Sequence, residues 1–197
     1  MRKALVGCAV LVFASLATAQ APSKGNVFVG YSYYNADWFS AGRANLNGWT
    51  GSLEGKVLPH LGIVADFSQT FGTQTIEFDC PGIGCPLTER VSAREYNLLF
   101  GPRISFSSRK LRPFVEGLFG VAHLNGNGQG VRPLSGSTLS FAMAFGGGVD
   151  YRIIRPIALR FEGDYIETRF FNTNSSAQFV RQTQNNARLS AGIVFRF

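Results

Sequence analysis

Eight stretches of the chain alternate large apolar side chains with small or charged ones. A period of two is typical of a β-strand, because successive side chains point to opposite faces. Clusters of glycine, proline and asparagine separate the stretches, as in turns. The pattern predicts strands over residues 26–35, 47–57, 61–72, 90–106, 113–123, 138–151, 157–168 and 186–197. Most are about as long as a tilted strand that crosses a bilayer, roughly 9 to 11 residues.

The connections between these strands alternate in length. Those after the second, fourth and sixth strands are short, and the others are long and polar. This alternation is typical of outer-membrane barrels, which have tight periplasmic turns and long extracellular loops. We therefore predict an all-β fold, an eight-stranded antiparallel up-and-down transmembrane β-barrel over residues 20–197, in a bacterial outer membrane and with both chain ends in the periplasm.

Residue size indicates which face of each strand points inward. Eight strands enclose a lumen just wide enough for side chains to fill, which suits faces of glycine, alanine, serine and charged residues. In the second strand Ser52 and Glu54 would point inward, and Trp49 and Leu53 outward into lipid. Aromatic residues toward both strand ends should form two girdles at the membrane boundaries. The alternative is a soluble sandwich with these aromatic residues in its core.

This choice of faces places charges of both signs in the lumen. The set has five bases and seven acids: Glu54, Lys56, Asp66, Glu95, Arg103, Glu116, Asp150, Arg160, Glu162, Asp164, Arg188 and Arg196. Buried charges are costly unless they are paired, so we expect a ladder of ion pairs. One interpretation is that these charges fill and lock the barrel. The other is that they line a narrow, porin-like path for ions or small solutes, with a gate that opens when pairs exchange.

The first nineteen residues have the features of a secretory signal peptide. Arg2 and Lys3 precede a short apolar run, and small residues lead to a predicted cleavage between Ala19 and Gln20. A lipobox-like stretch ending at Cys8 offers an alternative, acylation of that cysteine, but cleavage there would leave almost no hydrophobic core. We exclude residues 1–19 from the fold.

Composition agrees with strands that face lipid and argues against nucleic-acid binding. The chain has 18 Phe and 23 Gly but only 16% charged residues. Without Arg2 and Lys3 it has 17 basic against 12 acidic side chains, yet it has no basic run or basic helix. We therefore expect the membrane lipids, rather than nucleic acid, to surround the protein.

The second long connection contains the pair Cys80 and Cys85. Secretion would place both thiols in an oxidising compartment, and the intervening Pro-Gly-Ile-Gly allows a tight turn, so a disulfide within this loop is predicted. A metal clip is the weaker alternative, because no histidine is near in sequence and structural zinc requires four ligands. No metal or cofactor is expected.

Candidate sites for a reaction or a ligand are few. His123, at the end of the fifth strand, is the candidate for a lipid-modifying enzyme, but nothing in "GVAHLNG" supplies a nucleophile, so no catalytic residue is predicted. The third and fourth long connections, residues 126–137 and 172–184, are the candidates for an unknown extracellular ligand. We expect a structural or surface-interaction role.

Several segments together resemble the outer-membrane β-barrel domain family, the eight-stranded barrels similar to the transmembrane domain of outer-membrane protein A. They are "NVFVGYSYY", "LNGWTGSLEGKV", "LGIVADFSQTFG", "YNLLFGPRISF", "RPFVEGLFGVAH", "FAMAFGGGVDYR" and the closing "GIVFRF". The resemblance implies folding by the barrel assembly machinery with periplasmic chaperones. It also implies that Ile193, Phe195 and Phe197 form the C-terminal signal for that machinery. No peptidoglycan-binding domain follows, so a wall-tethering role is not expected.

Overall fold

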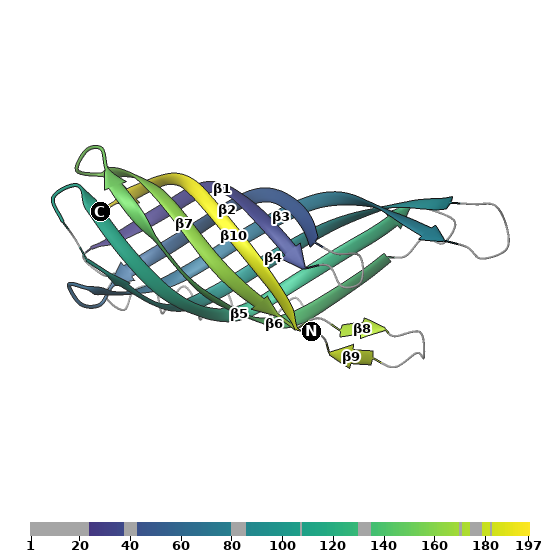
Figure 1. Cartoon of the computed structure of the whole chain (residues 1–197). Coiled ribbons are helices and arrows are strands. Elements are labelled where there is room, and N and C mark those ends of the chain that lie inside the picture. Colours follow the sequence, from purple (N-terminus) through teal and green to yellow (C-terminus); the bar gives the residue numbers. More distant parts are fainter. Residues whose placement is uncertain are drawn as a thin grey trace, which may run out of the picture.

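Eight antiparallel strands close into a barrel in the computed structural model, which describes residues 24–37, 43–79, 86–106, 108–129, 135–169, 171–173, 179–181 and 183–197 (Figure 1). The barrel strands are β1 (Gly25–Asp37), β2 (Arg43–Lys56), β3 (Leu61–Asp79), β4 (Pro86–Ser105), β5 (Leu111–Gln129), β6 (Ser135–Arg152), β7 (Ile157–Thr168) and β10 (Gln184–Arg196). A separate hairpin pairs β8 (Phe171–Thr173) with β9 (Phe179–Arg181). The predicted fold class is confirmed.

The barrel closes between its first and last strands. Around the barrel the order is β1-β10-β7-β6-β5-β4-β3-β2, so β10 pairs with both β1 and β7. The backbone N–H of Gly25 donates to the carbonyl of Phe197 at 3.0 Å, and the N–H of Phe197 donates back at 3.1 Å. The final strand therefore has no free edge.

Two predicted features lie outside the described residues. They are the signal peptide with its cleavage site between Ala19 and Gln20, and the disulfide between Cys80 and Cys85. Within the described residues, no helix has the length and apolar character needed to cross a membrane.

Four neighbouring strands are much longer than the other four. β3, β4, β5 and β6 have 19, 20, 19 and 18 residues, against 12 to 14 for the rest of the barrel. Their pairing continues to Asp79 opposite Pro86 and to Asn127 opposite Ser135. We call the parts beyond the barrel rim, residues 72–79, 86–93, 124–129 and 135–141, the extended sheet; in Figure 1 it projects to the right.

The extended sheet corrects the predicted strand ends. The third strand was expected to end at residue 72, and residues 126–137 were expected to be a loop. Polar composition misled the prediction, because backbone pairing in a hairpin above the membrane does not require lipid-facing apolar residues. Threonine, isoleucine and phenylalanine after residue 72 favour a strand whether or not lipid is present.

The outer face of the barrel is apolar. Large side chains on it include Val29, Leu53, Ile63, Leu98, Phe100, Val115, Phe119, Phe141, Phe145, Phe161, Leu189 and Ile193, all at least 40% exposed. Monomeric soluble proteins rarely expose an apolar area this continuous. Many bulky side chains thus lie outside, as predicted, although others such as Leu99 and Phe28 are buried in the lumen.

A belt of polar and aromatic side chains crosses the outer face below the extended sheet. Tyr31 lies opposite Trp49, Trp49 opposite Gln69, Gln69 opposite Tyr96, and Tyr96 opposite His123. Trp49 Nε1 donates to Gln69 Oε1 at 3.1 Å, and Gln69 Nε2 to the Tyr96 hydroxyl at 3.3 Å. Such amphipathic rings favour the boundary between lipid headgroups and acyl chains.

The lumen holds two levels of different character. Near the extended sheet an apolar level is formed by Tyr34, Ala36, Leu46, Val64, Leu99, Leu118, Ala122, Ala142, Ala144 and Ile166, all fully or almost fully buried. Charged side chains fill the level nearer the short-turn end, which is the end where β2–β3, β4–β5 and β6–β7 are connected. A smaller apolar cluster of Phe28, Ala158 and Val194 lies among them.

Candidate functional site

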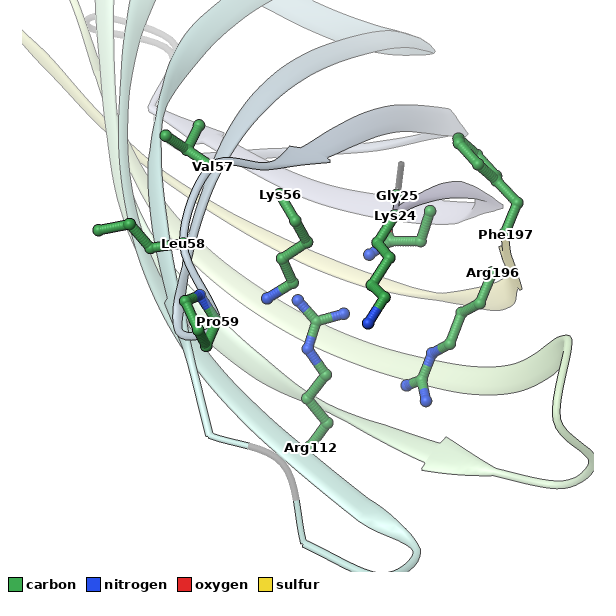
Figure 2. Close-up of a pocket in the computed structure, with 10 residues that line it drawn as sticks. Lys24, Gly25, Lys56, Val57, Leu58, Pro59, Arg112, Arg196 and Phe197 are labelled. Carbon is green, nitrogen blue, oxygen red and sulfur yellow. The ribbon is translucent and has the colours of Figure 1, made fainter. Parts of the chain in front are cut away.

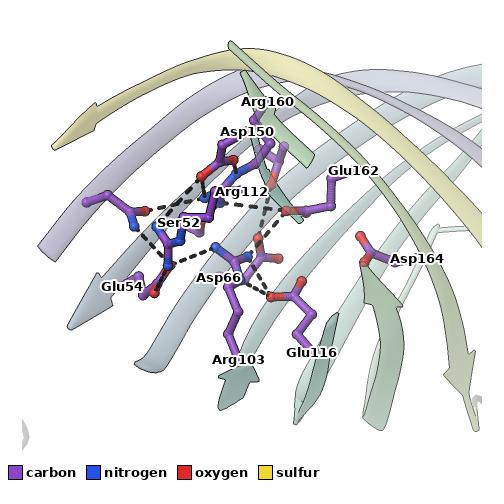
Figure 3. Close-up of polar contacts among 12 residues, drawn as sticks. Ser52, Glu54, Asp66, Arg103, Arg112, Glu116, Asp150, Arg160, Glu162 and Asp164 are labelled. Atoms are coloured by element: carbon purple, nitrogen blue, oxygen red, sulfur yellow. Dashed lines mark hydrogen bonds and ion pairs between the residues drawn. The ribbon is translucent and has the colours of Figure 1, made fainter. Parts of the chain in front are cut away.

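The charged level contains nearly all of the predicted inward charges. Ten of the twelve are buried, and Lys56 and Arg196, at the short-turn end, are half-buried. The alternation of side chains along each strand places these charges in the lumen, because every second residue points inward. Arg160, Glu162 and Asp164 therefore lie one above the other along β7 (Figure 3).

Three close ion pairs, each at 2.8 Å or less, join residues that lie directly opposite on neighbouring strands. Arg160 faces Asp150 and donates from Nε at 2.7 Å and from a terminal nitrogen at 3.2 Å. Arg188 faces Asp164 at 2.8 Å, and Arg103 faces Glu116 at 2.5 Å. Opposite charges in cross-strand positions stabilise the pairing of the two strands.

Other contacts of the same guanidinium groups cross the lumen. Arg103, on β4, also lies 3.4 Å from Glu54 on β2 and 3.3 Å from Glu162 on β7. Arg188, on β10, lies 2.7 Å from Asp66 on β3. None of these strand pairs is adjacent in the barrel. The network therefore braces opposite walls against one another.

Arg112 is a central member that the sequence analysis missed. It is 6% exposed and pairs with Glu54 and, at 3.7 Å, with Asp150. The predicted fifth strand begins only at residue 113, which leaves Arg112 in the short connection, whereas β5 begins at Leu111. Extending the period of two back from Glu116 through Phe114 would have found it.

With Arg112 the charges of the network balance. Six carboxylates, from Glu54, Asp66, Glu116, Asp150, Glu162 and Asp164, meet six cations, from Lys56, Arg103, Arg112, Arg160, Arg188 and Arg196. Equal numbers matter because an uncompensated charge in a closed lumen is costly.

Glu95 lies inside as expected but outside this network. It accepts hydrogen bonds from the Tyr34 hydroxyl at 2.8 Å and from the Asn97 amide at 3.1 Å. Among the described residues no base forms an ion pair with it, so the expected ladder of ion pairs does not extend to this level.

Two inward aromatic rings support the guanidinium groups and were not predicted. Arg103 lies 4.3 Å from the ring centre of Phe114, and Arg160 lies 5.0 Å from that of Phe28. Such cation–π contacts are favourable, more so away from water. Gly30 and Gly192 make room for Phe28, because a Cβ atom on either would lie within 3 Å of its ring.

Three carboxylates of the network, from Glu116, Glu162 and Asp164, lie close enough to one another to suggest a cation site. Arg103 contacts the first two at 2.5 and 3.3 Å, and Arg188 contacts Asp164 at 2.8 Å and Glu162 at 3.7 Å. Guanidinium groups therefore already compensate this acidic cluster.

Neither histidine lies in the lumen network. His123 stands opposite Tyr96 on the outer face, with ring centres 6.3 Å apart. His60 lies at the short-turn end, with Nδ1 3.2 Å from the Ser105 carbonyl and its ring stacked on Phe106. The position of His123 matches a polar residue at the membrane boundary.

The three residues of the predicted assembly signal lie on the outer face of β10 and directly after its end. Ile193, Phe195 and Phe197 are 43%, 49% and 64% exposed. Their recognition by an assembly machinery stays a prediction.

Comparisons with known proteins identify the family. The sequence profile named "Outer membrane protein beta-barrel domain" matches residues 6–197. No curated protein matches the chain. The structure is similar to Ail, the attachment invasion locus protein of Yersinia pestis, with 15% identity and a TM-score of 0.60 over 88% of this chain and 98% of that one.

Two further solved structures share the fold. Neisserial surface protein A has 12% identity and a TM-score of 0.59, over 88% of this chain and 97% of that one. The outer membrane protease OmpT of Escherichia coli has 8% identity and a TM-score of 0.50, over 89% and 97%. Because a protease shares the fold, the fold alone does not decide whether a barrel is an enzyme. The chain is a bacterial outer-membrane protein and belongs to the outer membrane protein β-barrel domain family.

Proposed function

We propose that this protein is a non-enzymatic surface-interaction protein, in which a closed barrel holds the extended sheet outside the cell. The observation that carries the proposal is the length of β3 to β6. Residues 72–79 continue β3 past the point where β2 stops pairing with it, a distance of about 25 Å at the usual rise of a strand.

The edges of the extended sheet support binding of a partner strand. Pairing of β2 with β3 ends where Asn47 faces Phe71, and pairing of β6 with β7 ends where Ala142 faces Thr168. In the described ladders, residues 72–79 and 135–141 each have only one neighbouring strand. Edge N–H and C=O groups of this kind can pair with a strand from another protein.

The filled lumen supports a role as a scaffold. Arg103, Arg160 and Arg188 are fully buried in the charged level, as are Leu99 and Ile166 in the apolar level. The part of the chain that holds the extended sheet is therefore braced by ion pairs and packed with side chains, which suits a rigid support.

We also propose the orientation. The short-turn end, with both Gly25 and Phe197, would face the periplasm, and the extended sheet would face outward, as is usual when turns are tight on one side and hairpins long on the other. Ail is named for attachment and invasion, and we extend attachment to this chain as part of the proposal.

The test shortens the extended sheet without touching the barrel. Residues 74–91 are replaced by Asn-Gly, a turn that suits a two-residue hairpin between the facing residues Thr73 and Ser92. Bacteria that display the variant should lose adhesion to cultured epithelial cells, while the barrel keeps its heat-modifiable migration on gels. A second variant trims residues 126–137, and a matched control shortens the β8–β9 hairpin instead. Full adhesion by both sheet variants would overturn the proposal.

A second candidate is a narrow channel, and shared ion pairs favour it. Arg103 contacts three carboxylates and Asp150 contacts three guanidinium groups, so partners can exchange without leaving a charge unpaired. Discrete current steps from the purified protein in planar bilayers would support a channel. Recordings of the folded protein that contain no current steps would rule out the channel.

A further inference from the structure

The short-turn end is strongly basic. Its connections and the adjoining end of β6 carry four exposed cations, Arg109, Lys110, Arg152 and Arg155, and the connections contain no acidic residue. Four more cations, Lys24, Lys56, Arg112 and Arg196, line a cavity of about 560 Å³ at the mouth of the lumen. We call this cavity the basic mouth. Its volume is in the range of sites that bind small molecules.

The cations of the basic mouth converge. Figure 2 shows the ammonium groups of Lys24 and Lys56 and the guanidinium groups of Arg112 and Arg196 pointing into one space, although they come from four separate segments. Val57 and Phe197 give the same cavity an apolar rim. Like charges repel, so this arrangement is costly unless anions lie among them.

Among the described residues, two carboxylates form ion pairs with cations of the mouth, and both are shared with cations deeper in the lumen. Glu54 is shared by Lys56, Arg103 and Arg112, and Asp150 by Arg112, Arg160 and Arg196. Within the described part of the chain, no carboxylate forms an ion pair with Lys24. Lys24 is thus one cation beyond the six-to-six balance of the network.

Unpaired donors also remain in the mouth. The Nε–H of Arg112 is buried and has no hydrogen-bond partner, and neither has that of Arg196. Arg112 is 94% buried, since only 6% of it is exposed. Buried donors normally have partners, and these two belong to guanidinium groups that line the cavity.

We propose that the basic mouth binds a phosphate-bearing anion, with Lys24, Lys56, Arg112 and Arg196 as its ligands. Phosphate suits this set because its several oxygens accept from guanidinium forks and ammonium groups at once. The anion would come either from a free phosphorylated solute or from a phospholipid headgroup at the adjacent membrane surface. This site is independent of what the extended sheet binds.

The test uses the full protein, purified from membranes in a maltoside detergent, which carries no phosphate. Inorganic phosphate is titrated at constant ionic strength while NMR follows the amide signals of Gly25 and Lys56. For the lipid source, short-chain phosphatidylglycerol is titrated into the same detergent sample in place of inorganic phosphate. A saturable shift in either arm supports the site and identifies its source, and no saturable shift in both arms overturns it.

Paired variants separate a site from general attraction. Lys24→Gln removes a cation that has no ion pair among the described residues, so the barrel contacts stay intact, and affinity should fall about tenfold. Lys110→Gln removes the same charge from an exposed turn at the same end, outside the cavity, and should change affinity less than about twofold. Equal losses in the two variants would contradict the proposal, because they would indicate diffuse electrostatic attraction.

Discussion

The two levels of the lumen stabilise the barrel in different ways. In the apolar level, side chains such as Leu99 and Leu118 pack without directional contacts. In the charged level, Arg103, Arg160 and Arg188 each require a carboxylate at a particular position on the neighbouring strand. A slip of one residue would turn every inward side chain outward and leave buried charges unpaired. The comparison teaches that the charged level specifies the register, whereas the apolar level fills space.

The largest expected effect comes from removing Arg103. Arg103→Met keeps most of the side-chain volume but leaves Glu116 without its cross-strand partner and removes contacts to Glu54 and Glu162. The free energy of unfolding should fall by about 3–5 kcal/mol, as for a broken buried ion pair. Urea titration of the protein in phospholipid vesicles measures this change.

The control for this prediction is Arg109→Met, on an exposed turn at the same end of the barrel. It should change stability by less than about 0.5 kcal/mol. If Arg103→Met proved equally mild, the charged level would not specify the register.

The faces of the strands could be predicted from sequence, but the aromatic rings inside the charged level could not. Alternation and residue size were enough to place Glu54, Asp150 and Arg160 inside, because a pleated strand has only two faces. The same rules would place large residues outside, yet Phe28 and Phe114 point inward. Their space depends in part on Gly192 and Gly148 of neighbouring strands, and the pairing of those strands is not visible in one segment.

The extended sheet and the ion-pair partner of each charged residue could not be predicted from the sequence either. Where a strand leaves the membrane, its outward residues change from apolar to polar. A strand that ends above the membrane has no such change at its end, so its end is not visible in the sequence. Arg188 and Asp66 lie 122 positions apart in the chain, and their strands are not neighbours in the barrel. Such contacts follow from closure, which depends on all eight strands together.

The apolar level should respond to a loss of volume. Leu99→Ala opens a cavity in a filled part of the lumen, and the free energy of unfolding should fall by about 2–4 kcal/mol in the same urea titration. The neighbouring Leu98, which is 40% exposed on the lipid face, provides the matched control. Leu98→Ala should cost less, because acyl chains fill the space that it leaves. Equal losses would show that the apolar level packs no better than lipid does.

A substitution of Arg160 tests whether a carboxylate that has several cationic partners limits the loss of stability when one partner is removed. Arg160→Ala removes one partner of Asp150, but Arg196 remains 3.1 Å away and Arg112 remains at 3.7 Å. We expect a loss of about 1–3 kcal/mol, smaller than for Arg103→Met. Planar-bilayer recordings of the same variant address the channel, since current steps that change with Arg160→Ala would show that the charged level conducts. A loss larger than that of Arg103→Met would contradict the sharing of partners.

The smallest effect is expected at Glu95, which contacts Tyr34 of the apolar level. Its partners, the Tyr34 hydroxyl and the Asn97 amide, are neutral donors, and a glutamine oxygen can accept from both. Glu95→Gln should therefore change the free energy of unfolding by less than about 1 kcal/mol. Glu116→Gln makes the same chemical change opposite Arg103, where it removes a charge that the guanidinium requires, so its loss in the urea titration should be clearly larger. Equal losses at the two positions would mean that Glu95 acts as part of the charged level, and the boundary between the levels would then lie closer to the extended sheet.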